Sequence, residues 1–178
     1  MLNWALDATR GRGGGLLELY CGNGNFCIAL APNFDSVLAT ELSRVGIAAA
    51  KYNLEANRVE NVKVAAISAE EFSAAYLDKQ PHKKLQKADI DLSEFSFGTV
   101  LVDPPRAGLD DLTVKLVSTF DTIVYISCNP DTLHANLEEL CNSHDVKRFA
   151  VFDQFPYTDH IECGVLLQRR TATEPADA

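Results

Sequence analysis

The chain has 178 residues, of which 47% are hydrophobic and 23% are charged, a composition that suits one soluble globular domain. It has no run of about 18 apolar residues, and no basic start precedes an apolar stretch, so we expect neither a transmembrane helix nor a secretory signal. The net charge of −9 argues against a surface that is basic throughout, which phosphate binding would favour.

The cysteines argue against a disulfide framework, because their number is odd and no CxxC pair occurs. The same spacing argues against a zinc site, so we expect no bound metal and a reducing, cytoplasmic setting. The five are Cys21, Cys27, Cys128, Cys141 and Cys163.

Strand and helix patterns alternate along the chain. Apolar runs predict strands at residues 16–20, 36–42, 62–68, 98–103, 122–127, 146–154 and 162–170. Helices are predicted up to Leu30, from an N-cap at Ser43 towards Asn57, at 69–76, at 109–119, and after Asn129 and Pro130. Residues 78–94 are polar and predict a solvated loop, and the tail 171–178 is expected to be disordered.

This alternation predicts an α/β fold with helices on both faces of a doubly wound, mostly parallel sheet of seven strands. No helix separates the last two strands, so we expect one antiparallel edge strand. Residues 1–170 are expected to form a single domain.

Three loops leave predicted strands with the chemistry of a cofactor site. Gly22 and Gly24 allow a sharp turn beside a ligand, and Glu41 follows Gly22 by 19 residues, where a carboxylate can accept ribose hydroxyls. Asp103 ends the fourth strand in VDPPR. An adenosine-type cofactor is therefore indicated, but these loops alone do not separate NAD from S-adenosylmethionine. Cys27 stands where the third glycine of a dinucleotide signature would be.

Cys128 lies in YISCNP, before a predicted helix whose N-terminus would favour a thiolate. Its position alone leaves open a buried structural thiol. A nucleophilic thiolate that adds to carbon 6 of uracil would make carbon 5 reactive towards a methyl donor, and a general base must then remove the carbon 5 proton. Glu162 is the candidate base, with Asp159 and His160 as alternatives.

Four motifs occur together and in a fixed order: ELYCGNGNF, VDPPR, YISCNP and DQFPYTDHIECGVLL. Together they resemble the tRNA (uracil-5-)-methyltransferases, which form 5-methyluridine in the T-loop of bacterial tRNA, and the resemblance extends over residues 1–169. It implies a Rossmann-like class I methyltransferase fold, S-adenosyl-L-methionine as cofactor and the T-arm of tRNA as partner. We expect a monomer.

The resemblance also implies roles for individual residues. It assigns cofactor contacts to Tyr20, Asn25, Glu41 and Asp103, the nucleophile to Cys128, the general base to Glu162 and a uridine contact to Arg106. The resemblance further implies an N-terminal region that binds RNA and supplies a glutamine to the cofactor, and we expect that region to be missing from these 178 residues. We therefore expect this catalytic domain alone to bind the cofactor weakly and to methylate tRNA poorly or not at all.

Four alternatives remain open. A ribosomal-RNA uracil-5 methyltransferase would share the motifs, and a non-catalytic tRNA-binding or tRNA-folding module would share the fold. Amino-group methylation of a base is disfavoured, because Arg106 stands where those enzymes carry an aromatic residue. A nicotinamide dehydrogenase is disfavoured by the missing third glycine.

Overall fold

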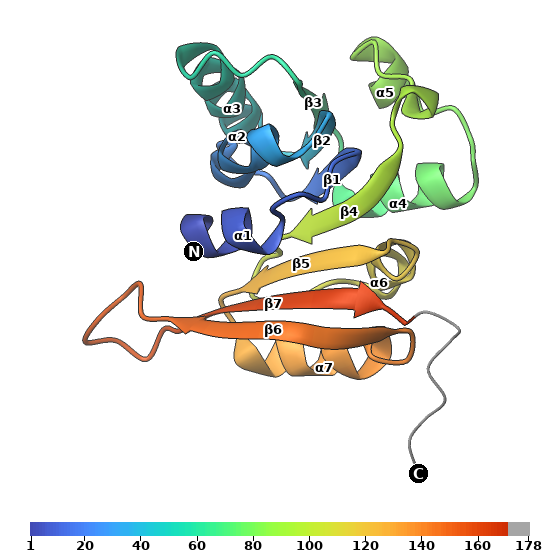
Figure 1. The fold of residues 1–178 in the computed structure, drawn as a ribbon. Helices are drawn as coiled ribbons and strands as arrows, with labels where there is room; N and C mark the ends of the chain where they lie inside the picture. The colour runs from blue at the N-terminus through green and yellow to red at the C-terminus, as the bar shows by residue number, and fades with distance from the viewer. Residues whose placement is uncertain (171–178) are drawn as a thin grey trace.

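The computed structural model describes residues 1–170 as one seven-stranded sheet with helices on both faces (Figure 1). The tail predicted for 171–178 lies outside the described residues. The strands are β1 (Gly15–Leu19), β2 (Ser36–Glu41), β3 (Val62–Ala66), β4 (Phe97–Val102), β5 (Thr122–Ser127), β6 (His144–Phe152) and β7 (Glu162–Arg169). The helices are α1 (Leu2–Ala8), α2 (Asn25–Leu30), α3 (Arg44–Ala56), α4 (Ala69–Leu77), α5 (Lys83–Lys87), α6 (Asp111–Val117) and α7 (Pro130–Leu140), with 3-10 turns η1 (Ala31–Asn33) and η2 (Leu92–Glu94).

The sheet confirms the predicted fold class. Its order is β3-β2-β1-β4-β5-β7-β6, and the pairs from β3 through β5 are parallel. The chain adds β2 and β3 on one side of β1 and then β4 and β5 on the other. This reversal creates a switch point between β1 and β4, where ligands bind in open α/β sheets.

One strand, β7, runs against the others, as predicted, and it lies one position inside the edge strand β6. The burial of the two strands explains this order. Residues 163–167 of β7 are all buried, whereas β6 is exposed or half-buried along its length after His144. A strand that is apolar on both faces gains most when a neighbour covers each of its edges.

Two apolar clusters fill the space between the sheet and its helices. Leu17 and Leu19 face the cluster under α4, α6 and α7, while Leu16 faces the cluster under α1 and α2. Because side chains alternate along a strand, Glu18 points to the same side as Leu16. A carboxyl group therefore enters an apolar layer.

The predicted helix starts are confirmed. Ser43 accepts a hydrogen bond from the backbone N–H of Gly46 at 3.3 Å, and Asn129 accepts one from the N–H of Asp131 at 3.1 Å. Pro130 occupies the first turn of α7. Among residues 1–170, no helix is long and apolar enough to span a membrane.

The prediction of a solvated loop at 78–94 was wrong. The segment forms α5 and η2, and it buries Leu85 and Ile90 in the core beside α4. Two apolar side chains five positions apart in a polar stretch are too few to give a helical period, so the pattern did not reveal the packing.

Helix α1 was also not predicted, and it joins the beginning of the chain to the last two strands. Trp4 packs edge-on against Phe152, with 5.9 Å between ring centroids, and Asp7 accepts a hydrogen bond from Arg148 at 2.9 Å. Gly164 makes room for this contact, because a Cβ there would lie 2.9 Å from the Trp4 ring.

Candidate active site

The predicted site residues follow the carboxyl ends of four strands and the start of β7. Leu19 pairs with Val102, so the next residues, Tyr20 and Asp103, leave neighbouring strands at the switch point. Glu41 ends β2 one strand further along. The sheet therefore brings the predicted cofactor residues to one edge.

The pairing of β5 with β7 bears on the predicted nucleophile and the predicted base. Ser127 of β5 pairs with Cys163 of the antiparallel strand β7. Cys128 is the first residue after β5 and Glu162 is the first residue of β7, so this pairing brings the two residues to the same end of neighbouring strands. Both side chains are half-buried.

The glycine turn after β1 uses backbone conformations that favour glycine. Gly22 has a φ of 56° and Gly24 a φ of 86°, both in the left-handed region. Gly24 is the N-cap of α2, so Asn25 becomes the first residue of the helix, with its side chain exposed. The turn thus directs the N-terminus of α2 towards the same edge.

Glu41 is fixed by three backbone N–H groups. One carboxylate oxygen accepts from Gly22 at 2.9 Å, and the other accepts from Leu42 at 2.8 Å and Ser43 at 2.6 Å. A carboxylate has about four acceptor positions, so roughly one is left for a ligand. A Cβ on Gly46 would lie 3.1 Å from Cγ of Glu41, so only glycine at this position leaves the Glu41 side chain undisturbed.

Tyr20 also adopts a left-handed conformation, with a φ of 63°, which is uncommon for a tyrosine. Its ring is half-buried against the cluster under α4 and α6, and burial raises the pKa of its hydroxyl to about 12. The side chain is therefore a neutral group at physiological pH.

Two acids among the predicted site residues, Asp103 and Glu162, have raised pKa values. Burial and, to a lesser extent, the negative charge of Glu162 together raise the pKa of Asp103 to about 6. Burial likewise raises the pKa of Glu162, although the positive charges of Arg106 and His160 oppose this. Such pairs of perturbed acids are typical of functional sites.

Arg106 is held on both its backbone and its side chain. Its carbonyl oxygen accepts hydrogen bonds from Asn129 at 2.9 Å and Thr132 at 3.2 Å, both at the start of α7. Its guanidinium lies 3.2 Å from Nδ1 of His160. The loop that follows β4 is thereby joined to the loop that precedes Glu162.

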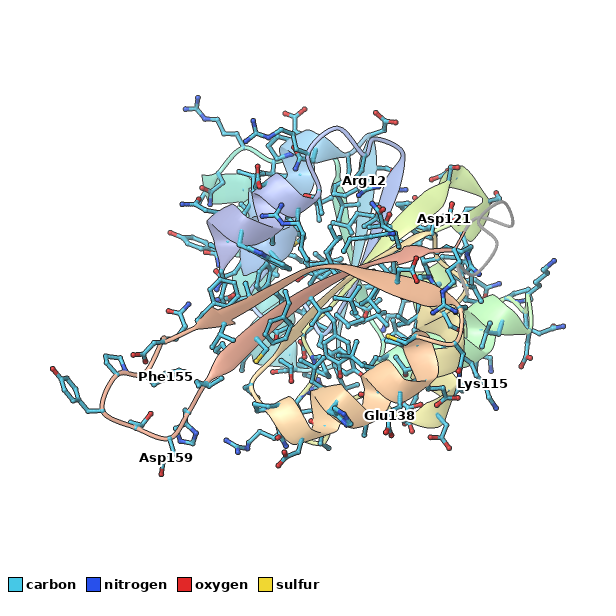
Figure 2. The ribbon with its side chains drawn as sticks, turned by 60° about the horizontal axis from the view of Figure 1, so that its bottom comes forward. Arg12, Lys115, Asp121, Glu138, Phe155 and Asp159 are labelled. Atoms are coloured by element: carbon cyan, nitrogen blue, oxygen red, sulfur yellow. The ribbon has the colours of Figure 1, made fainter. Side chains whose placement is uncertain are left out.

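The remaining cysteines behave as expected for structural or incidental thiols. Cys21, Cys27 and Cys163 are buried, and Cys141 is half-buried at the C-cap of α7. No disulfide joins any of the five, all of which lie within the described residues. Asp159, an alternative base, is exposed on the loop that projects beyond β6 and β7 (Figure 2).

Sequence reasoning missed Glu18. Its side chain is 1% exposed, and within residues 1–170 its Oε2 has no hydrogen-bond partner. Burial, with a smaller contribution from the nearby charge of Asp103, raises its pKa to about 8. The available signal was a charged residue inside the otherwise apolar strand LLELY.

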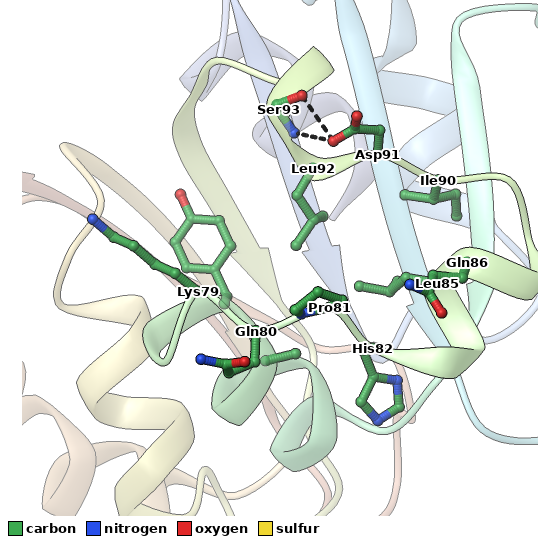
Figure 3. Close-up of a pocket in the computed structure, with 12 residues that line it drawn as sticks. Lys79, Gln80, Pro81, His82, Leu85, Gln86, Ile90, Asp91, Leu92 and Ser93 are labelled. Carbon is green, nitrogen blue, oxygen red and sulfur yellow. Dashed lines mark hydrogen bonds between the residues drawn. The ribbon is translucent and has the colours of Figure 1, made fainter.

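A cavity of about 750 Å³ lies at the amino ends of the strands, opposite the candidate site, where α4, α5 and η2 precede β4 (Figure 3). None of the seven predicted site residues is among those that line it. A shallower depression of about 460 Å³ includes Asn25 and Gln154, on the side of the predicted site.

The donor set at the carboxyl edge suits an adenosine-type cofactor. Glu41 offers a carboxylate to ribose hydroxyls, and the glycine turn leaves its backbone open to a ligand. The carboxylate of Asp103 adds negative charge that would complement a cationic group. In the described part of the chain, no group of three or more His, Cys, Asp or Glu residues could hold a metal ion.

A sequence model of the family described as tRNA (uracil-5-)-methyltransferase matches residues 1–170. The chain belongs to this family. A relative from Neisseria meningitidis named tRNA/tmRNA (uracil-C(5))-methyltransferase is 55% identical over 96% of this chain. A relative from Acinetobacter baumannii with the same name is 56% identical over 95% of it. The match covers 46% and 47% of those two proteins, so the chain spans about half their length.

The fold agrees with a solved member of the tRNA uracil methyltransferases. The Pyrococcus abyssi tRNA (uracil-54, C5)-methyltransferase, solved with S-adenosyl-L-homocysteine, superposes with a TM-score of 0.72 at 28% identity. The superposition covers 93% of this chain and 36% of that one.

Proposed function

We propose that this chain transfers a methyl group from S-adenosyl-L-methionine to carbon 5 of a uridine in the T-loop of tRNA. The observation that carries the proposal is the pairing of Ser127 with Cys163, because Cys128 directly follows Ser127 and Glu162 directly precedes Cys163. Membership of the tRNA (uracil-5-)-methyltransferase family supports the substrate. The five free cysteines support a reducing, cytoplasmic setting.

The chemistry begins with the thiol of Cys128. Its thiolate adds to carbon 6 of the uracil ring, and the electron pair of the 5,6 double bond moves towards carbon 5 and the carbonyl oxygen. Carbon 5 thereby becomes nucleophilic. S-adenosyl-L-methionine, when bound, supplies the electrophilic methyl group. Carbon 5 then carries both the methyl group and its original proton.

Glu162 completes the reaction as the general base. Its carboxylate takes the proton from carbon 5, the 5,6 double bond re-forms, and the bond from carbon 6 to the sulfur of Cys128 breaks. Burial raises the pKa of Glu162, and a base whose pKa approaches the working pH accepts a proton more readily. Arg106 supplies a cation beside this carboxylate for the charge that develops on the uracil oxygen.

The cofactor would be held around the glycine turn. Glu41 would accept the ribose hydroxyls, and Tyr20, Asn25 and Asp103 would line the remainder of the site, as their positions at the carboxyl edge support. A T-arm RNA would approach from the side on which Arg106 and Glu162 are exposed or half-buried.

The test uses a T-arm stem-loop that carries 5-fluorouridine at the target position, mixed with the chain and S-adenosyl-L-methionine. Fluorine cannot leave as a cation, so the adduct with Cys128 should persist and be detected by intact mass. Cys128→Ala should form no adduct, whereas Cys141→Ala, which removes another half-buried thiol, should form it normally.

The relative from Neisseria meningitidis serves as the control for the RNA. Because this domain alone is expected to react slowly, the reaction is run with excess RNA and cofactor over long times; if the RNA then traps that protein and this chain stays unmodified, the proposed activity of this chain is wrong. An adduct that persists in Cys128→Ala would contradict the nucleophile. An adduct with a ribosomal-RNA hairpin in place of the T-arm would contradict the substrate.

A further inference from the structure

The loop at 153–161 joins β6 to β7 and projects beyond the rest of the molecule (Figures 1 and 2). It presents aromatic and apolar side chains to solvent: Phe155 is 51% exposed, Tyr157 is fully exposed and Ile161 is 42% exposed. Exposed apolar groups that gather on one loop, away from the core, are typical of an interaction site.

Hydrogen bonds within the loop hold these rings outward. The backbone N–H and the hydroxyl of Thr158 both donate to the carbonyl of Phe155, at 3.2 Å and 2.7 Å, and the N–H of His160 donates to the hydroxyl of Thr158 at 3.2 Å. Tyr157 has a φ of 69°, a conformation that disfavours tyrosine. Unfavourable backbone geometry at a defined position suggests a function that requires it.

The loop is continuous with the candidate active site. Phe155 packs edge-on against His160, with 6.2 Å between ring centroids, and His160 lies 3.2 Å from the guanidinium of Arg106. Two residues later the chain reaches Glu162, which opens β7. A ligand bound in the site would therefore extend past these rings.

We propose that Phe155 and Tyr157 form a stacking platform for the unpaired RNA bases that flank the target uridine. The proposal rests on the proposed function and adds to it the contact that holds the loop of the RNA. Chemistry on a base within a folded RNA requires that base to leave its stack, which deprives its neighbours of a stacking partner. Aromatic side chains replace that partner in proteins that bind single-stranded RNA.

The charge of the chain favours stacking over phosphate contacts. The net charge is −9, and several of the cations are already paired with carboxylates, among them Lys63, Lys84, Arg148 and Arg170. Stacking requires no positive charge, so it gives an acidic domain a means of holding RNA. Its contribution should also be independent of salt, unlike that of phosphate contacts.

The experiment measures binding of the chain to a T-arm stem-loop with 2-aminopurine on either side of the target uridine. Stacking of this base on an aromatic ring changes its fluorescence. We expect Phe155→Ala and Tyr157→Ala each to weaken binding by at least about 5-fold and to lose the fluorescence change. Tyr157→Phe should bind like the unaltered chain, because a phenyl ring stacks without the hydroxyl.

Matched controls exist on other elements. Phe149 on β6 is 57% exposed and Tyr52 on α3 is 72% exposed, so Phe149→Ala and Tyr52→Ala remove similar rings elsewhere on the surface. Both should leave the binding and the fluorescence change intact. The loss in Tyr157→Ala should be the same fold-change at low and high salt.

Three results would overturn the platform. They are equal binding by the loop variants and the controls, no fluorescence change with the unaltered chain, or a Tyr157→Phe variant as weak as Tyr157→Ala. The 5-fluorouridine adduct separates this failure from failure of the proposed function. An adduct formed normally by chains with altered loops would leave the function standing and remove the platform.

Discussion

The cavity at the amino ends of the strands and the candidate active site at their carboxyl ends differ in the environment of their acidic side chains. At the amino end, the cavity of about 750 Å³ is large, but its acid Asp91 is a satisfied N-cap whose pKa is lowered by the hydrogen bonds from Ser93 (Figure 3). At the carboxyl end, burial raises the pKa of both Glu18 and Asp103, and a neighbouring acid adds to the shift in each case: Asp103 for Glu18, and Glu162 for Asp103. Buried acids with raised pKa values therefore indicate the position of the candidate active site better than cavity volume does.

Glu162→Gln would test that contrast most severely. Without a base for the carbon 5 proton, we expect turnover to fall about 10²- to 10⁴-fold while the bond between Cys128 and the uracil still forms. Methylated RNA should then accumulate as a protein adduct even on ordinary uridine, visible by intact mass. Glu138→Gln, an exposed change on α7, is the control and should turn over normally (Figure 2). Unreduced turnover in Glu162→Gln would exclude it as the base.

The buried acid Glu18 predicts a pH-dependent stability. Its folded-state pKa of about 8 lies above the ordinary value of 4.5, so the folded state binds more protons between those values. Its contribution to the free energy of unfolding is complete below about pH 4.5 and is lost as pH rises through 8.

Between pH 6 and pH 8.5 the unaltered chain should therefore lose roughly 2–3 kcal/mol more than Glu18→Gln, as measured by denaturant unfolding. The comparison of slopes removes the contributions of other groups that titrate in that range. Parallel curves for the two chains would show that Glu18 does not hold its proton in the folded state.

Two glycine substitutions compare the ends directly. Gly46→Ala should weaken S-adenosyl-L-methionine binding about 3- to 10-fold, because its Cβ would displace the carboxylate of Glu41. Gly98→Ala at the start of β4 adds the same methyl group where no atom lies within 4 Å, so affinity should not change. Calorimetry measures both, and equal affinities would show that Glu41 tolerates movement.

The smallest effect is expected at the amino end. Gln80 lines the cavity there and is exposed, so Gln80→Trp adds bulk to the cavity without disturbing the core. Methylation rate and cofactor affinity should both stay within about 2-fold of the unaltered chain. A loss of 10-fold or more in the methylation assay would mean that the two ends are coupled.

The fold was predictable because strands and helices alternate with clear periods, and because Pro104, Asn129 and Pro130 mark where elements stop and start. The carboxyl edge was predictable for the same reason, since parallel strands end together. Strand order and register depend on contacts between distant segments. The pairing of Ser127 with Cys163 was therefore available only from the structure.

Other features of the site were not predicted, because in the sequence each of them is marked by a single residue at most. Glu18 is one charge in an apolar strand, and only its burial reveals that it keeps a proton. The fixed position of Arg106 depends on Asn129, Thr132 and His160, which lie 23 to 54 positions away along the chain. No local pattern records such contacts.

The contact of Trp4 with Phe152 and Gly164 has a consequence for synthesis on the ribosome. Helix α1 is made about 160 residues before the strand on which it packs, which at about 5–20 residues per second is a delay of roughly 10 to 30 seconds. Until β6 and β7 emerge, α1 can pack only through Ala5 and Ala8 on β1 and α2, and the ring of Trp4 lacks Phe152 and Gly164 as neighbours. The nascent chain therefore exposes the Trp4 ring to chaperones until β6 and β7 form and pack against it.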